Sequence, residues 1–159
     1  MPRSPDDPMN DTPRSSVQSV LFACSENAVR SPIAEALARR LIGHSTHLIS
    51  AGVRRGDANP FTLETLAEIG IDLSRHRPRT FEDLDESSFD LIITLSPEAH
   101  HRALEFTRTM AVEVIYWPTF DPTAVEGSRS AMSSAFRLVR DTLAKRIDLY
   151  FRGMVAAPS

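Results

Sequence analysis

The sequence predicts an α/β fold, in which a parallel β-sheet is covered by helices on both faces. Apolar runs typical of strands alternate along the chain with segments whose apolar residues recur at helical spacing. The run at residues 89–95 is apolar enough to be buried on both faces, as the strands of parallel sheets are. Successive strands are then expected to be joined by right-handed crossovers.

Length and composition indicate one globular domain. The 159 residues are enough to bury a sizeable core, and 42% of them are hydrophobic and 25% charged. A net charge of −3 gives no electrostatic reason to expect nucleic acid or an anionic membrane as a partner. The single cysteine excludes an internal disulfide framework and fits a cytoplasmic location, and no apolar run approaches the length of a membrane span.

The folded domain is expected over residues 17–151. Residues 1–16 contain four prolines and little to bury, which predicts a disordered N-terminal tail without the apolar core of a signal peptide. Residues 152–159 are expected to be a frayed C-terminus.

The first strand and helix lie directly after the tail. Residues 17–22 form an apolar, β-branched-rich run that predicts a buried strand. From Ser31 onward the apolar residues recur at helical spacing, with Ser31 suited to the N-cap, Pro32 to the first helical position and Gly43 to the stop.

The rest of the chain continues the alternation. Further strands are predicted at residues 47–52, 89–95 and 112–117, and further helices at 60–69, 97–107 and 132–150. His100 and His101 are adjacent on a helix and point about 100° apart, so they predict no metal pair. Arg54 and Arg55, in the loop before the second helix, are interpreted as solvated residues, with attraction of an anionic substrate as the alternative.

The loop between the first strand and helix carries the candidate chemistry. It begins at Cys24 and ends at Arg30, beside a helix N-terminus whose unpaired N–H groups and dipole suit a phosphate-sized anion. The guanidinium of Arg30 can donate two hydrogen bonds to the same anion. The positive field of the helix N-terminus is also expected to stabilise the thiolate of Cys24. A lone cysteine at the end of a strand is more often a small core residue. Its place in this loop favours a nucleophile that attacks phosphorus.

The segment C-S-E-N-A-V-R-S-P, residues 24–32, resembles the phosphate-binding loop C-x-G-N-x-C-R-S of low-molecular-weight protein tyrosine phosphatases, a family that includes arsenate reductases. The resemblance implies that Cys24 is the nucleophile and that Arg30 binds phosphate. The implied phosphate-binding residues are Ser25, Glu26, Asn27, Ala28, Val29 and Arg30. Glu26 replaces the loop glycine, which usually supplies an unusual backbone angle or a close approach, and Val29 replaces a second cysteine.

The resemblance also implies a set of supporting residues. Ser31 matches the serine that stabilises the thiolate, and Asn27 matches a structural asparagine. Ser50, in S-A-G after the second strand, would hold Asn27, although a serine satisfied locally is an equally good interpretation. His76, in I-D-L-S-R-H, matches a histidine tied to the same network, with an exposed histidine as the alternative.

Asp121 is the predicted general acid and base. It lies in a D-P pair after the last strand, where the family places that residue; a D-P pair alone is a common turn. Thr123 stands where many members have tyrosine, and the loop after Gly52 has no aromatic residue. Both expected aromatic walls of an aryl-binding cleft are therefore missing.

The resemblance implies a four-stranded sheet in the order 2-1-3-4, which places Cys24 at the topological switch point where ligands bind. The chain lacks G-x-G-x-x-G and G-x-x-x-x-G-K-[ST], so neither a dinucleotide nor a nucleoside triphosphate is expected, and neither a metal nor an organic cofactor is predicted.

The predicted function is hydrolysis of a phosphomonoester, on a protein or a small molecule, through a cysteinyl phosphate. One alternative is an arsenate reductase that uses an external thiol, because the chain has no second cysteine to relay a disulfide. The other is a phosphatase-like anion-binding module with little turnover, because Glu26 brings a negative charge into the loop.

Overall fold

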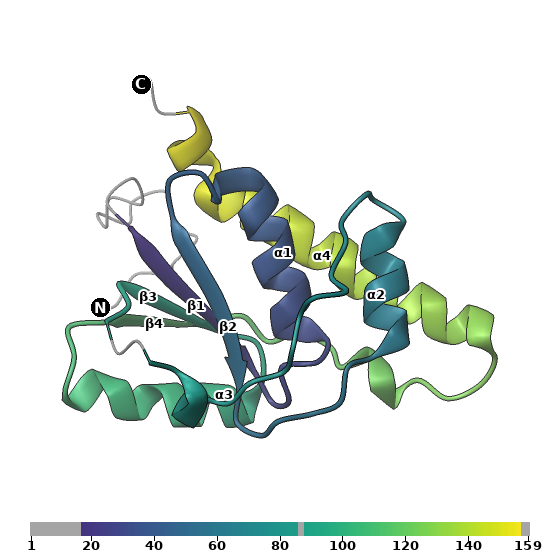
Figure 1. Cartoon of the computed structure of the whole chain (residues 1–159), viewed down its shortest axis with the longest axis horizontal. Helices are drawn as coiled ribbons and strands as arrows, with labels where there is room; N and C mark the ends of the chain where they lie inside the picture. The colour runs from purple at the N-terminus through teal and green to yellow at the C-terminus, as the bar shows by residue number, and fades with distance from the viewer. Residues whose placement is uncertain (1–16, 86–87, 157–159) are drawn as a thin grey trace.

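The computed structural model describes residues 17–85 and 88–156, which form a four-stranded parallel sheet with helices on both faces (Figure 1). The strand order is β2-β1-β3-β4, so the predicted order is confirmed. The elements in chain order are β1 (Ser19–Cys24), α1 (Arg30–Ile42), β2 (His47–Gly52), α2 (Pro60–Ala67), η2 (Phe81–Asp83), β3 (Leu91–Thr94), α3 (Pro97–Leu104), η3 (Glu105–Arg108), β4 (Glu113–Tyr116), η4 (Pro122–Ala124) and α4 (Arg129–Ala156).

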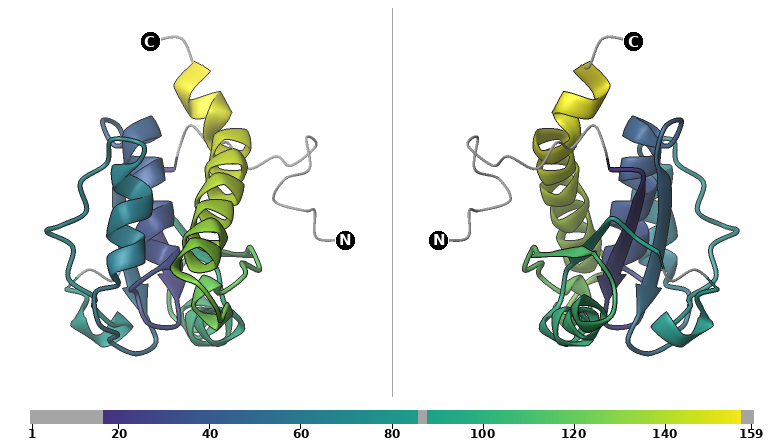
Figure 2. Two further views of the ribbon diagram at one scale, coloured as in Figure 1. Left: turned by 90° about the vertical axis from the view of Figure 1, so that its right-hand side faces the viewer. Right: turned by 90° about the vertical axis from the view of Figure 1, so that its left-hand side faces the viewer.

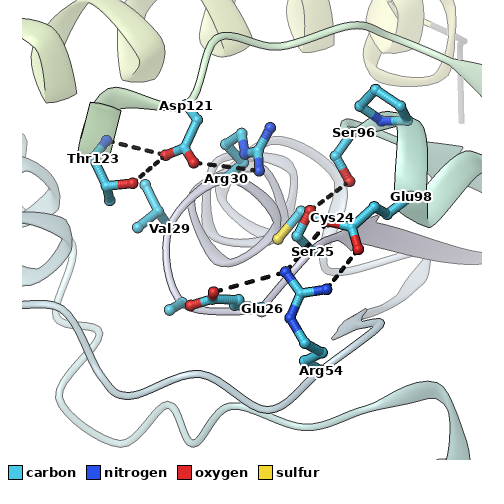
Figure 3. Close-up of a pocket in the computed structure, with 12 residues that line it drawn as sticks. Cys24, Ser25, Glu26, Val29, Arg30, Arg54, Ser96, Glu98, Asp121 and Thr123 are labelled. Carbon is cyan, nitrogen blue, oxygen red and sulfur yellow. Dashed lines mark hydrogen bonds and ion pairs between the residues drawn. The ribbon is translucent and has the colours of Figure 1, made fainter. Parts of the chain in front are cut away.

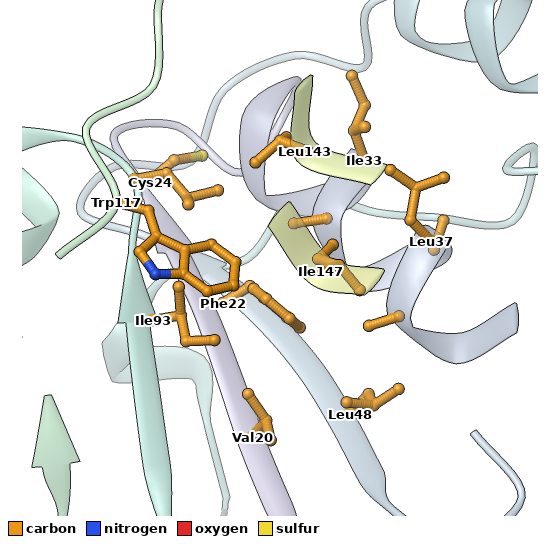
Figure 4. Packing of buried hydrophobic residues seen from close by; sticks show 14 of the residues in the cluster. Val20, Phe22, Cys24, Ile33, Leu37, Leu48, Ile93, Trp117, Leu143 and Ile147 are labelled. Atoms are coloured by element: carbon orange, nitrogen blue, oxygen red, sulfur yellow. The ribbon is translucent and has the colours of Figure 1, made fainter. Parts of the chain in front are cut away.

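Alternate residues of β1 belong to two separate cores, because successive side chains of a strand point to opposite faces. Val20 and Phe22 lie in the core that α1 and α4 cover, where Figure 4 shows Phe22 beside Trp117. Leu21 and Ala23 lie in the smaller core that α3 covers. Figure 1 shows α3 on one side of the sheet and α1 and α4 on the other, and Figure 2 shows α1 and α4 side by side. Burial on both faces explains why the strand is an unbroken apolar run.

The start of α1 differs from the prediction. The helix begins at Arg30, and Val29 precedes it without a side-chain cap. Ser31 is the second helical residue and is fully buried, with its hydroxyl bonded to side chains of the loop. The prediction of Ser31 as the N-cap is therefore wrong. Pro32, expected at the first helical position, is the third helical residue. It still fits the first turn, because the amides there have no acceptor within the helix.

The ends of the elements place the candidate residues. β1 spans Ser19–Cys24 where residues 17–22 were expected, so Cys24 is the last residue of the strand. α4 continues to Ala156 and therefore extends into the end that was expected to fray. Residues 1–16 and 157–159 lie outside the described residues. Within residues 17–85 and 88–156, no helix is long and apolar enough to cross a membrane.

An ion-pair cluster joins α2 to α4. Glu68 accepts hydrogen bonds from Arg137 Nη2 at 2.7 Å and from Arg140 Nη1 at 2.8 Å. Arg140 is largely buried and also donates to the carbonyl of Thr65 at 2.8 Å. The hydrogen bonds from Arg137, and then those from Arg140, lower the pKa of Glu68 to about 2. The carboxylate therefore stays ionised in the folded state well below the pH at which it is protonated in the unfolded chain.

The substitution Glu68→Gln tests this cluster. Because the pKa of Glu68 is lower in the folded state, the contribution of this carboxylate to stability is present above about pH 4.5 and is lost as the pH falls toward 2. We expect Glu68→Gln to lower the thermal midpoint at pH 7 and to weaken the dependence of that midpoint on pH between about 5 and 2. Glu126→Gln is the matched control, because the described residues offer Glu126 no ion pair. Equal pH dependence in the native protein and Glu68→Gln would contradict the assignment.

Candidate active site

Residues 25–29 connect the end of β1 to the start of α1 and curve around the helix end (Figure 3). The segment after β2 runs along this loop and holds its backbone: Arg54 N donates to the carbonyl of Ser25 at 2.8 Å, and Gly56 N donates to that of Glu26 at 2.9 Å. A Cβ at Gly52 would lie 2.7 Å from Asn27 N, closer than side chains approach a backbone. Glycine at position 52 therefore lets β2 end directly against the loop.

Asn27 is the buried centre of the loop. It is 0% exposed and adopts φ 58°, in the left-handed region. Its Nδ2 donates to the hydroxyls of Ser31 and Ser50, each at 2.9 Å, and its Oδ1 accepts from Arg79 N at 3.0 Å. The carbonyl of Asn27 lies 2.9 Å from His76 Nε2. The contacts expected of Ser50 and His76 are thus present, and several separate segments hold one strained residue.

Cys24 and Ser31 form the second contact of the loop. The sulfur of Cys24 lies 2.9 Å from Ser31 Oγ and accepts a longer hydrogen bond, 3.4 Å, from Ser31 N. Because Asn27 already donates to Ser31 Oγ, the hydroxyl hydrogen of Ser31 is available to the sulfur. Two donors from the first turn of α1 are therefore directed at the sulfur of Cys24.

Arg30 and Asp121 face each other across the site. Arg30 Nη1 donates to the carbonyl of Thr119 at 3.1 Å, and Arg30 Nη2 lies 3.9 Å from Asp121 Oδ2. The side chain of Arg30 is largely buried, whereas that of Asp121 is 46% exposed. Asp121 Oδ1 accepts from Thr123 N at 3.0 Å and from Thr123 Oγ1 at 2.7 Å, which leaves Oδ2 directed into the cleft (Figure 3).

The cleft above Cys24 has a volume of about 310 Å³. Its lining comes from the loop, α3 and the segment around η4: Cys24, Ser25, Glu26, Ala28, Val29, Arg30, Arg54, Ser96, Pro97, Glu98, Asp121 and Thr123. The predicted site residues that do not line it, Asn27, Ser31, Ser50 and His76, form the network behind the loop. None of the lining residues is aromatic, as the sequence predicted.

Glu26 fits the loop without the backbone angle that a glycine supplies. Asn27 is the one non-glycine residue with a positive φ among those the structure describes, so Glu26 has an ordinary conformation. Its side chain is half exposed and lies against Gly56, where a Cβ would come within 2.7 Å of Glu26 Cβ. The close approach in this chain is therefore made by Gly56 opposite the loop.

The mouth of the cleft carries charged side chains whose proximity the sequence did not predict. Arg54, interpreted as a solvated loop residue, donates to the two oxygens of Glu98 at 2.5 and 3.2 Å and lies 3.9 Å from Glu26. The hydrogen bond and charge of Glu98 raise the pKa of Arg54, and the same hydrogen bond is the largest cause of the lowered pKa of Glu98. Ser25 also donates to Ser96 Oγ at 3.1 Å. No spacing in the sequence signals Ser96 or Glu98, since α3 reaches the loop only in the folded chain.

Metal binding has no support in this part of the chain. Among the described residues, no group of three or more histidine, cysteine, aspartate or glutamate side chains could hold an ion. The arrangement instead joins a sulfur, a guanidinium and a carboxylate around one cleft.

The fold and this arrangement define the class of protein. The family model for low-molecular-weight phosphotyrosine protein phosphatases matches residues 19–152, so the chain belongs to that family. The proteins it is similar to include some named phosphatases and some named arsenate reductases.

Particular relatives show this range. An arsenate reductase of Halalkalibacterium halodurans is 31% identical over 132 residues, which cover 82% of this chain and 93% of the relative. The crystal structure of a YwlE mutant from Bacillus subtilis is 25% identical, with a TM-score of 0.70 over 86% of this chain and 98% of that one. The low-molecular-weight protein tyrosine phosphatase of T. tengcongensis shares the fold, with 23% identity and a TM-score of 0.70 over 85% of this chain and 98% of that one.

The substitution Asn27→Ala tests the centre of the loop. The substitution removes three side-chain hydrogen bonds and leaves an alanine, which cannot form them, at a positive φ. We therefore expect the free energy of unfolding, measured with urea, to fall by about 2–4 kcal/mol. Asn59→Ala, which removes one helix-capping hydrogen bond, should cost about 1 kcal/mol. Asn27→Gly loses the same three hydrogen bonds but tolerates the positive φ, so its loss should fall between the two. Equal losses in Asn27→Ala and Asn59→Ala would contradict this account.

Proposed function

We propose that this protein hydrolyses phosphomonoesters through a cysteinyl-phosphate intermediate on Cys24. The observation that carries the proposal is the position of the Cys24 sulfur, which lies in one cleft with Arg30 and Asp121 and is hydrogen-bonded to Ser31. The family relationship supports the same chemistry. The substrate is a phosphorylated protein or small molecule, and the reactive thiol suits a reducing compartment such as the cytoplasm.

The first step transfers the phosphoryl group to sulfur. The thiolate of Cys24 attacks phosphorus, so that an S–P bond forms as the P–O bond of the ester breaks. Arg30 and the loop amides hold the non-reacting oxygens and stabilise their charge. Asp121 Oδ2, directed into the cleft, donates its proton to the departing oxygen.

The second step returns the enzyme to its starting state. Asp121, now a carboxylate, takes a proton from a water molecule that attacks phosphorus. The S–P bond breaks, the electron pair returns to Cys24 as a thiolate, and inorganic phosphate leaves. Hydrogen bonds from Ser31 to the sulfur stabilise this leaving thiolate.

The test is hydrolysis of two phosphate esters that differ in leaving group, para-nitrophenyl phosphate and phenyl phosphate. Cys24→Ser should abolish turnover of both. Asp121→Asn should reduce kcat for phenyl phosphate by about 10²-fold and that for the nitrophenyl ester less, because a nitrophenolate leaves without a proton. Equal losses on the two esters would contradict the acid role of Asp121.

The substitution Glu26→Gly tests whether the glutamate suppresses activity. Because Glu26 has an ordinary backbone conformation and a half-exposed side chain, we expect the change to alter kcat/KM for para-nitrophenyl phosphate by no more than about threefold. An inactive native protein that gains turnover in Glu26→Gly would favour the anion-binding module instead. In that case phosphate would still protect Cys24 from alkylation.

The names of the relatives favour arsenate reduction as the second candidate. Here the thiolate of Cys24 attacks arsenate, so that an S–As bond forms as an As–O bond breaks and the hydroxyl group leaves, with a proton, as water. A thiol from solution then attacks the Cys24 sulfur, so that the S–As bond breaks, arsenite leaves with the electron pair and a mixed disulfide remains. A second thiol molecule must then reduce the mixed disulfide, because the sequence holds no other cysteine. Arsenate-dependent oxidation of added thiol, absent in Cys24→Ser, is the measurement that identifies this reaction.

A further inference from the structure

The charged side chains of the cleft are unbalanced toward the negative. Five ionisable side chains besides Cys24 line it: Glu26, Glu98, Asp121, Arg30 and Arg54. With Asp121 protonated for its role as acid, the thiolate and the two glutamates still provide three negative charges against two positive ones. A phosphate dianion therefore enters a cleft that already carries net negative charge.

Arg54 does not correct this imbalance, because its guanidinium is already paired. It makes two hydrogen bonds to Glu98, at 2.5 and 3.2 Å, and its Nη2 lies 3.9 Å from Glu26 Oε2. Figure 3 shows Arg54 between the two carboxylates at one side of the cleft, with Arg30 and Asp121 at the other. The carboxylates of Glu26 and Glu98 thus share the one guanidinium of Arg54, and the three groups together retain a net negative charge.

The two carboxylates are accessible to a substrate. The side chains of Glu26 and Glu98 are 56% and 50% exposed, and both line the cleft. They belong to different elements, the loop and the first turn of α3, so a group entering between them is held from two sides. No aromatic residue lines the cleft, so an aryl ring of a substrate has no aromatic side chain to stack on. The mouth therefore presents charged groups to a substrate, and no aromatic ones.

We propose, resting on the phosphatase activity proposed above, that the preferred substrate carries a positive charge beside its phosphate and that Glu26 and Glu98 bind it. A lysine or arginine flanking a phosphorylated residue has this chemistry. The cation offsets the surplus negative charge of the cleft, whereas an acidic neighbour meets like charge on both sides. Glu26 then acts as a specificity residue, which gives a role to the carboxylate that replaces the loop glycine.

The experiment uses three phosphotyrosine peptides that differ only in the two flanking residues, which are Arg, Gln or Glu. For the native protein we expect kcat/KM to fall in that order, by about three- to tenfold at each step, the range for one or two half-exposed ion pairs. The differences should reside mainly in KM and should shrink at high salt. Binding of the same peptides to Cys24→Ser provides a second readout that needs no turnover.

The double variant Glu26→Gln, Glu98→Gln is the decisive comparison. It releases Arg54 from both carboxylates, so the peptide flanked by Glu should become the preferred one. Glu105→Gln, which removes an ion-paired glutamate outside the cleft, should keep the native order.

The outcomes separate this proposal from the phosphatase activity itself. Native hydrolysis without charge preference at low salt, or a native preference for the acidic peptide, would overturn the role of Glu26 and Glu98 and leave the phosphatase intact. Charge-ordered binding to Cys24→Ser without hydrolysis of any peptide or ester by the native protein would overturn the phosphatase and retain the cation subsite.

Discussion

The left-handed backbone of Asn27 is the constraint on which the rest of the site depends. That conformation is unfavourable for a residue with a Cβ. It persists because the side chain of Asn27 is hydrogen-bonded to residues of α1, of β2 and of the segment before η2. The same hydrogen bond that holds Asn27 to Ser31 frees the Ser31 hydroxyl hydrogen for Cys24. Backbone shape and the chemistry of the sulfur are therefore set by one network.

The sheet order explains where this network can form. β1 lies between β2 and β3, and the chain leaves it for α1 on one face while α3 covers the other. The ends of β2, β3 and β4 and the segments that follow them consequently meet at the carboxyl end of β1. Ser50 and Arg54 arrive from β2, Glu98 from the helix after β3, and Asp121 from the loop after β4.

The departures from the family loop have different physical consequences. Val29 in place of the second cysteine leaves Cys24 without an internal thiol partner, which bears on how an arsenate adduct would be resolved. Glu26 leaves the backbone conformation unstrained and changes the charge of the cleft instead. With Glu98 and Arg54 it gives the mouth of the cleft an ionic surface, whose interactions weaken as the salt concentration rises.

The sequence by itself determined the strand–loop–helix unit with Cys24 and Arg30, because a helix N-terminus binds anions through groups that are local in the chain. Asp121 and the supporting pair Ser50 and His76 followed only from family resemblance, since their contacts span long stretches of sequence. Tertiary structure alone decided that Ser31 is not the helix cap, and that Arg54 meets Glu98, 44 residues away. Such pairings depend on which segments the sheet order brings together, and residue spacing does not encode that.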